Sequence, residues 1–219
     1  MTVAVVDEQL EQPDEPILNI VGERVALGPL RSDLIDAHLR WGNDWATYRL
    51  LDNIQGPGTR EHVAGWLRQA TSGTLPYDFL IYERASLQAI GTVGLRDVDL
   101  QSGTAEFTIG IGEQEFRGRG LGTEATRLTL DYAFNVLGLH NVMLRVMAFN
   151  TAALRTYRRV GFREIGRRRQ AHWMGGQSWD MIYMDILAGE FSSSVTCPSA
   201  SDARGVRQPR ERRPTRRQR

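Results

Sequence analysis

At 219 residues, with 41% hydrophobic residues, the chain is long enough for one well-buried domain and contains no apolar run of membrane-spanning length. All 27 basic residues are arginines, and the lack of lysine excludes a Walker-type phosphate loop and any mechanism that forms a lysine Schiff base. The formal net charge of +1 combines +7 in residues 204–219 with −6 in the remainder, so the main part of the chain is acidic and suits a basic partner.

Cysteine and histidine usage excludes further classes. The single cysteine, Cys197, cannot form an intramolecular disulfide, and the first sixteen residues hold five acidic and no basic side chains, unlike a secretory signal. We therefore expect a cytoplasmic protein that neither spans nor binds a membrane. The four histidines are scattered and form no Cys/His cluster, so we expect no metal site.

The ends of the chain differ from its middle. Residues 1–16 and 191–219 lack apolar periodicity, so we expect a disordered N-terminal arm, a domain over residues 17–190 and a disordered arginine-rich tail. The tail is open to three interpretations: a solvated end, a contact with nucleic acid or the ribosome, or a docking segment. It has no interleaved aromatic residues for base stacking, which argues against specific nucleic-acid binding.

The elements before residue 100 are predicted from periodicity and caps. An apolar run over 25–30 precedes Ser32 and Asp33, which we expect to cap a helix ending near Arg40. Thr59 is expected to cap a second helix, and residues 77–84 and 88–98 predict two strands joined by a tight turn. The apolar face of the second helix contains Val63, Trp66, Leu67 and Ala70.

The elements after residue 100 alternate between strands and helices. Strict alternation over 105–111 predicts a strand, with Phe107, Ile109 and Ile111 on one face. A glycine-rich loop and a helix ending at Gly138 follow, then a strand over 142–148 and a short helix ending at Gly161. Residues 162–169 and 178–187 predict a final hairpin, so the whole predicts a layered α/β domain. The helix before Gly138 should bury Ala125, Leu128, Tyr132 and Val136.

The glycine-rich loop, residues 117–122, is the segment most informative about chemistry. Its sequence is Arg-Gly-Arg-Gly-Leu-Gly, placed between a strand and the start of a helix. Glycines let backbone N–H groups converge, and a helix start attracts anions, so a pyrophosphate is the expected ligand. A dinucleotide-binding fingerprint is disfavoured because the third glycine comes one residue early and Thr123 stands in its place.

Two separated motifs resemble the GNAT acyltransferase superfamily. The loop is similar to that family's acyl-CoA pattern, Gln/Arg-x-x-Gly-x-Gly/Ala, at Arg117, Gly120 and Gly122. The family's second signature is matched at Asn150, Leu154, Tyr157, Gly161 and Phe162. The resemblance covers roughly residues 20–188, and the residues after the loop look like the branch of ribosomal-protein N-terminal acetyltransferases and antibiotic-modifying relatives.

The resemblance implies a central mixed, mostly antiparallel sheet with helices on both faces and a splayed strand pair that binds acyl-CoA. The donor would be acetyl-CoA, and the acceptor a primary amine of a small molecule or a peptide N-terminus. Pairing into a homodimer is common in the family. The implied acyl-CoA-binding residues are Phe107, Thr108, Ile109, Gly110, Ile111, Arg117, Gly118, Arg119, Gly120, Leu121, Gly122, Thr123, Asn150 and Tyr157.

The resemblance also implies direct transfer with Tyr157 as the acid that protonates the departing thiolate. Some relatives use as base a glutamate five residues before the signature asparagine, but Arg145 stands there, so Glu106 is our substitute candidate. Each residue has a plainer interpretation: Tyr157 as a packed core tyrosine, Glu106 as a solvent-facing strand residue, and Arg117 and Arg119 as solvated loop residues.

The acceptor side is less defined. Trp41 and Trp45 stand where relatives place substrate-binding helices, and His172 and Trp173, expected in the late hairpin loop, are candidates for its border. Two other function classes remain open at this point. One is a non-catalytic acyl-CoA-binding module, and the other, based on the tail alone, is a nucleic-acid-binding protein.

Overall fold

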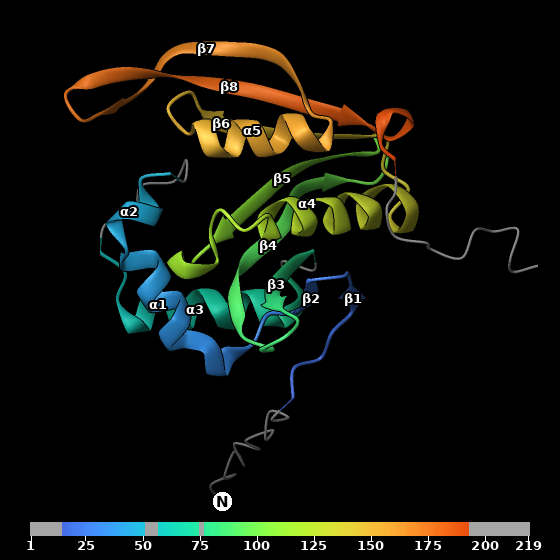
Figure 1. The fold of residues 1–219 in the computed structure, drawn as a ribbon. Coiled ribbons are helices and arrows are strands. Elements are labelled where there is room, and N and C mark those ends of the chain that lie inside the picture. The colour runs from blue at the N-terminus through green and yellow to red at the C-terminus, as the bar shows by residue number, and fades with distance from the viewer. Residues whose placement is uncertain (1–14, 51–56, 75–76, 193–219) are drawn as a thin grey trace, which may run out of the picture.

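The computed structural model describes residues 15–50, 57–74 and 77–192, which build an eight-stranded sheet with helices on both faces (Figure 1). The strands lie in the order β1-β2-β3-β4-β5-β6-β8-β7. All neighbours are antiparallel except β5 and β6, which run parallel and therefore need the crossover that helix α4 provides. The predicted layered fold with a mixed, mostly antiparallel sheet is confirmed.

The elements follow the predicted order along the chain. The first half contains β1 (Ile20–Val21), β2 (Val25–Pro29), α1 (Ile35–Asn43), α2 (Trp45–Tyr48), α3 (Arg60–Gln69), β3 (Asp78–Glu83) and β4 (Ala89–Asp99). The second half contains β5 (Thr104–Ile111), α4 (Leu121–Asp131), β6 (Asn141–Met147), α5 (Thr151–Val160), β7 (Arg163–Met174) and β8 (Gln177–Leu187). Thr59 caps α3 as predicted, because its hydroxyl accepts a hydrogen bond from the His62 N–H at 3.2 Å.

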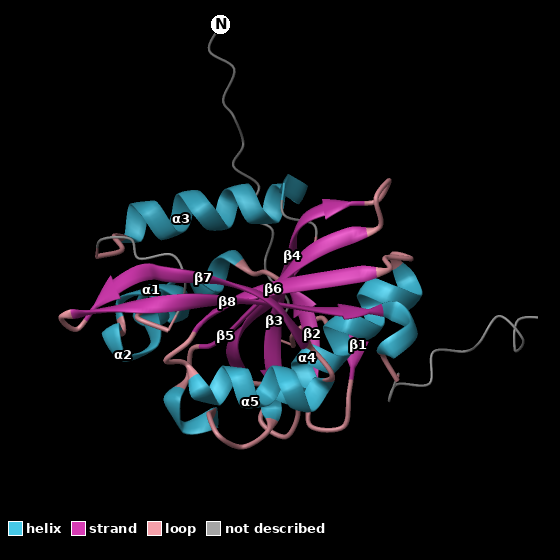
Figure 2. Cartoon of the chain, turned by 90° about the horizontal axis from the view of Figure 1, so that it is seen from above, coloured by secondary structure: helices cyan, strands magenta, loops and turns pink. Residues whose placement is uncertain are grey.

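The two faces of the sheet are covered by different helices. Helices α4 and α5 lie on one face, while α1 and α3 lie on the other (Figure 2). The main core lies on the α4 and α5 face, where Phe107 packs with Leu121 and Leu128. Trp41, Leu80 and Tyr82 form a smaller cluster on the opposite face. The predicted alternation of β5 is thus confirmed, because Phe107 belongs to the main core and Glu106 points to the other face.

Two predictions about the helices are wrong. Among the described residues no side chain caps α1: a short 3₁₀ turn over Ser32–Leu34 precedes the helix, and the Asp33 carboxylate pairs with Arg31 at 2.7 Å. Val136 is 59% exposed, because α4 continues into a wider π turn over Tyr132–Val136 that shifts the phase of its apolar face. The Leu137 N–H donates to the Tyr132 carbonyl at 3.0 Å, five residues back, which marks that turn.

Strand β7, one of the two edge strands of the sheet, is rich in arginine. With β8 it forms a long hairpin that extends beyond α5 (Figure 1). Its four arginines are all exposed: Arg163, Arg167, Arg168 and Arg169. Most of the predicted arm (1–16) and tail (191–219) lies outside the described residues, so their disorder stays a prediction. Within the described ranges, no helix has the length and apolarity needed to cross a membrane.

Candidate functional site

The sheet opens between β5 and β6. These strands pair only from Thr104 with Asn141 to Glu106 with Met143. Beyond that point β5 continues to Ile111 and β6 to Met147, but in the described residues β6 pairs only with β8 over this stretch. The predicted splayed pair is therefore confirmed, and we call the stretch between the separated strand ends the opening.

The edge of β5 that faces the opening carries backbone hydrogen-bonding groups. The Gly112 N–H donates to the Ile90 carbonyl of β4 at 2.9 Å. Because backbone groups alternate in direction along a strand, those of Ile111, Ile109 and Phe107 point away from β4. Two of these groups already have partners, because the last β5–β6 bridge uses the Phe107 N–H and Arg117 Nε donates to the Ile111 carbonyl. The others, both groups of Ile109 among them, face the opening. Such groups need partners, and an extended amide-containing molecule would supply them as an added strand does.

The glycine-rich loop lies at the start of α4, beside the same end of β5. Gly118 and Gly120 have φ values of +71° and +84°, which favour glycine. Gly122 has no such backbone requirement, and a Cβ there would meet Ile111 Cγ1 at an ordinary 3.7 Å. The turn therefore explains the first two glycines, while the third leaves room for close approach of a molecule that the fold itself does not provide.

The start of α4 is suited to an anion. Its cap residue, Gly120, has no side chain to accept from the first N–H groups, and its carbonyl accepts from Thr123 and Glu124 at 3.1 and 3.2 Å. The N–H groups of Leu121 and Gly122 point out of the helix end, where the helix dipole adds positive potential. The Leu121 side chain is buried in the core, so this residue fixes the position of the loop.

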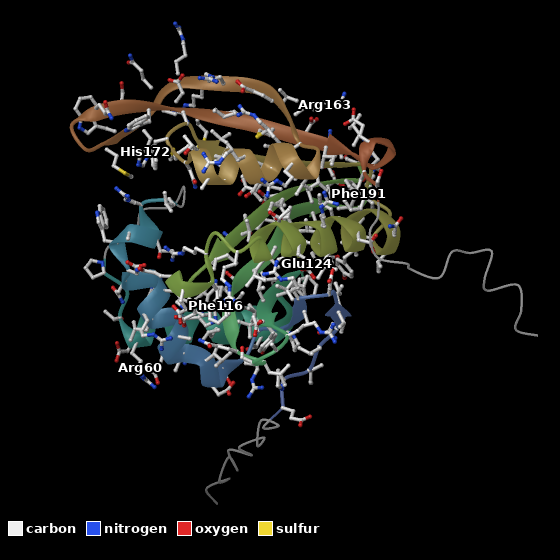
Figure 3. The ribbon with its side chains drawn as sticks, viewed as in Figure 1. Arg60, Phe116, Glu124, Arg163, His172 and Phe191 are labelled. Atoms are coloured by element: carbon white, nitrogen blue, oxygen red, sulfur yellow. The ribbon has the colours of Figure 1, made fainter. Side chains whose placement is uncertain are left out.

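The two arginines of the loop differ in placement. Arg117 Nε donates to the Ile111 carbonyl and its Nη2 to the Gly112 carbonyl, both at 2.9 Å, and Nη2 also contacts the Thr47 hydroxyl. Arg117 therefore neither reaches outward for a phosphate nor solvates the loop. Arg119 is exposed and lies 5.1 Å from the ring centre of Phe116, which Figure 3 shows near the start of α4.

The second motif lies on the opposite side of the opening, at α5. The Asn150 side-chain oxygen caps α5 by accepting from the Ala153 N–H at 3.1 Å. Tyr157 is 8% exposed, with ring centres 6.2 Å from Phe107 and 5.7 Å from Phe162. Burial raises the pKa of Tyr157 to about 12, so its hydroxyl is protonated at neutral pH.

Glu106 lies where the two strands begin to separate, on the face opposite Tyr157. Its Oε1 accepts a hydrogen bond from Arg145 Nε at 2.8 Å, and its side chain is 16% exposed. The plainer interpretation, a solvent-facing residue, does not fit this placement. Arg145, which stands where some relatives have a glutamate, instead holds the Glu106 carboxylate beside the opening.

Helices α1 and α2 reach the end of β5 through contacts that the sequence did not predict. Glu113 accepts from the Trp41 indole at 3.0 Å and pairs with Arg40 at 2.6 Å. Asp44, the cap of α2, accepts from Gln114 at 2.9 Å. These partners lie about seventy residues apart in the chain, so no local pattern could have revealed them.

The remaining aromatic candidates lie around the hairpin. His172 and Trp173 are strand residues of β7, not loop residues as expected. His172 is opposite Trp179, which stacks edge-on against Phe149 at 5.1 Å, while Trp173 is 72% exposed. Figure 3 places His172 at the end of the molecule where α2 also lies. Trp45, at the start of α2, is 62% exposed.

The described residues contain no cluster of His, Cys, Asp and Glu that could hold a metal ion.

Comparison with known proteins agrees with this geometry. Residues 24–163 match the family model described as an acetyltransferase (GNAT) domain, which covers both motifs and the opening between them. The chain belongs to this family. The recognition made from the two motifs is thereby confirmed.

Curated relatives of this GNAT chain include polyamine and ribosomal acetyltransferases. Spermidine N(1)-acetyltransferase of Escherichia coli K12 is 33% identical over 108 residues, 49% of this chain and 58% of the relative. A putative ribosomal N-acetyltransferase of Bacillus subtilis is 31% identical over 101 residues, 46% of this chain and 55% of the relative. The match therefore spans little more than half the length of these curated relatives.

Solved structures share the fold over most of the described chain. Spermidine N-acetyltransferase from Vibrio cholerae, in complex with CoA and spermine, has a TM-score of 0.70 at 22% identity and covers 77% of this chain and 98% of that one. A GCN5-related N-acetyltransferase from Brucella melitensis has a TM-score of 0.65 at 26% identity and covers 80% of each chain. Because the Vibrio cholerae structure is only 22% identical in sequence, its similarity supports the GNAT fold alone.

Proposed function

We propose that this GNAT chain transfers an acetyl group from acetyl-CoA directly to a primary amine. The observation that carries the proposal is the opening beside α4. It combines the β5 edge around Ile109, which has no partner strand in the described residues, with a helix start suited to an anion ten residues after Ile111. Family membership and the spermidine acetyltransferase relatives support the same reaction.

The residues present fit the chemical parts of acetyl-CoA. The amide groups of the pantetheine arm would extend the sheet along the open edge of β5. The pyrophosphate would bind the backbone N–H groups from Gly118 to Gly122, with the room at Gly122 allowing its approach. A backbone N–H of the β5 edge would stabilise the negative charge that develops on the thioester oxygen.

Proton transfer would involve one side chain on each face of the sheet. Tyr157, protonated at neutral pH, would protonate the departing thiolate. Glu106, on the opposite face, would accept the proton of the attacking amine, directly or through water, while Arg145 holds it in place. Direct transfer needs no enzyme nucleophile, and Cys197 lies outside the described residues.

The acceptor is proposed to be a small aliphatic amine or a peptide N-terminus. The spermidine acetyltransferase relatives favour a polyamine, and the ribosomal relative favours a peptide. The negative charge of residues 1–203 suits either, because both are cationic near neutral pH. We propose that the cytoplasm is the site of this reaction.

The test is a panel of amines incubated with acetyl-CoA and the purified chain. Panel members should include spermidine and a peptide with an N-terminal alanine, and the readouts are thiol release and the mass of one added acetyl group. We expect at least one acceptor to turn over. If none does although acetyl-CoA raises the melting temperature, the chain is a non-catalytic acyl-CoA-binding module. A larger shift with NAD or ATP than with acetyl-CoA would exclude both.

A further inference from the structure

The arginine of the first motif connects the acyl-CoA loop to α2. Besides its bonds to the carbonyls of Ile111 and Gly112, the Arg117 guanidinium contacts the Thr47 hydroxyl and lies 3.7 Å from Asp44 Oδ2. The Thr47 hydroxyl in turn donates to Asp44. The Arg117 guanidinium therefore bonds both to Ile111, the last residue of β5, and to Thr47 of helix α2.

Further contacts join the same two regions. Gln114 Nε2 donates to Asp44 Oδ2 at 2.9 Å, and the same carboxylate caps α2 through the Ala46 N–H at 3.1 Å. The Trp41 indole of α1 packs so closely on Gly112 that a Cβ there would lie 2.2 Å from it. We call this set of contacts, centred on Asp44, Thr47 and Arg117, the α2 junction.

The burial and charge of the junction distinguish it from an ordinary surface ion pair. Thr47 is 6% exposed, and the side chains of Arg117 and Asp44 are 28% and 25% exposed. Exposed pairs contribute little, but partly buried charged groups with several hydrogen bonds each have one favoured arrangement. Any shift of the loop or of the β5 end must therefore disturb α2, and any shift of α2 must disturb the loop.

We propose that Asp44 and Thr47 are positioning residues that couple α1 and α2 to the acyl-CoA loop through Arg117. Loop residues ordered by CoA hold Arg117 in place, and Arg117 then holds Thr47 and Asp44. Because linkage is reciprocal, a molecule that orders α1 and α2 binds more tightly when CoA is present. The inference depends on the proposed function only in taking CoA as the ligand of the loop.

Hydrogen exchange with CoA as the probe tests the coupling without knowledge of the acceptor. In the full-length wild-type chain, CoA should slow amide exchange at residues 118–124, which would contact it, and also at residues 35–48, which would not. In Thr47→Val, protection at 118–124 should remain while the added protection at 35–48 disappears. The dissociation constant for CoA should rise roughly fivefold, near the lower end of measured site-to-site couplings.

Three variants separate coupling from simple damage to α2. Thr47→Ser keeps the hydroxyl and should restore the wild-type pattern, whereas Asp44→Asn should resemble Thr47→Val. Asp36→Asn is the matched control, because Asp36 lies on α1 and pairs with Arg60 of α3, away from the junction. Its response to CoA should equal that of the wild type.

The outcomes distinguish the coupling from the proposed function. Protection confined to 118–124 in the wild type would overturn the coupling and leave acyl-CoA binding intact. Protection at 35–48 that survives in folded Thr47→Val would overturn the role of the junction. If CoA protects neither segment, the proposed function and the coupling both fail.

Discussion

The two motifs beside the opening differ in how far the fold alone accounts for them. In the second motif, Asn150 caps α5 and Tyr157 fills the core against Phe107 and Phe162, so each side chain has a structural use. In the first, Gly122 is required by neither its backbone angles nor its packing, and the N–H groups at the start of α4 point outward. The fold therefore leaves Gly122 of the first motif unexplained, while the role of the second motif requires a variant that separates packing from chemistry.

The largest expected effect comes from Tyr157→Phe, which keeps the buried ring and removes the hydroxyl. If Tyr157 protonates the thiolate, kcat should fall on the order of 100-fold, with little change in KM for acetyl-CoA or in melting temperature. Steady-state kinetics with an acceptor from the amine panel measure this. Normal kcat in the variant would assign Tyr157 to packing alone. The second motif would then be explained by the fold, in contrast to the first.

The next effect concerns Gly120→Val in the first motif. A β-branched residue is strained at a φ of +84° and would also obstruct the loop, so affinity for acetyl-CoA should fall about tenfold or more. Calorimetric titration measures it. Gly138→Val is the matched control: its φ is +70°, it has open space around it, and it lies beyond the C-terminal end of α4. Equal affinity losses in both variants would show general strain, contrary to the role of the loop.

A smaller effect is expected from Asn150→Ser, which keeps a good helix cap but shortens the side chain. If the Asn150 amide contacts the pantetheine or adenylate part of CoA, KM for acetyl-CoA should rise by up to about tenfold, the worth of one hydrogen bond. Melting temperature should hardly change, whereas Asn150→Ala should cost about 1 kcal/mol in free energy of unfolding. Unchanged KM in the serine variant would leave Asn150 with its capping role only.

The smallest effect is the response of Tyr157 to alkali. An ordinary tyrosine loses its proton near pH 10, but burial raises the pKa of Tyr157 to about 12. The acid form therefore persists, and kcat should stay level between pH 8 and about 10 as far as Tyr157 is concerned. The pKa of Tyr157 is higher in the folded state than in the unfolded state. The protonated Tyr157 therefore contributes its full share to the free energy of unfolding below about pH 10, and this share is lost as pH rises towards 12. A fall in kcat near pH 9 that Tyr157→Phe lacks would contradict this.

Features specified by nearby residues were predicted from sequence. The alternation of Phe107 and Ile109, the Thr59 cap and the glycine loop each depend on residues a few positions apart, and the structure has them as expected. The cap at Ser32 and Asp33 failed because Arg31 binds the Asp33 carboxylate. The burial of Val136 failed because the helix widens by one residue in its last turn.

The parts of the site that depend on tertiary contacts could not be predicted. The Glu106–Arg145 ion pair requires the register of two parallel strands that separate one residue later, and nothing in either strand specifies that register. The inward turn of Arg117 depends on Thr47 and Asp44, seventy or more residues earlier. The first motif therefore led to the family, whereas the contacts of the Arg117 side chain with α2 were not predicted.

The arginine-rich edge strand β7 bears on how two copies of this chain can meet. An edge strand carries unpaired backbone groups that invite strand addition from a second molecule. If two β7 strands paired antiparallel about a twofold axis near Arg167 and Arg168, like charges would face each other across the new ladder, and such pairs are destabilising. The arginines thus disfavour extension of the sheet along this edge, so a second copy of the chain would be expected to bind through another surface.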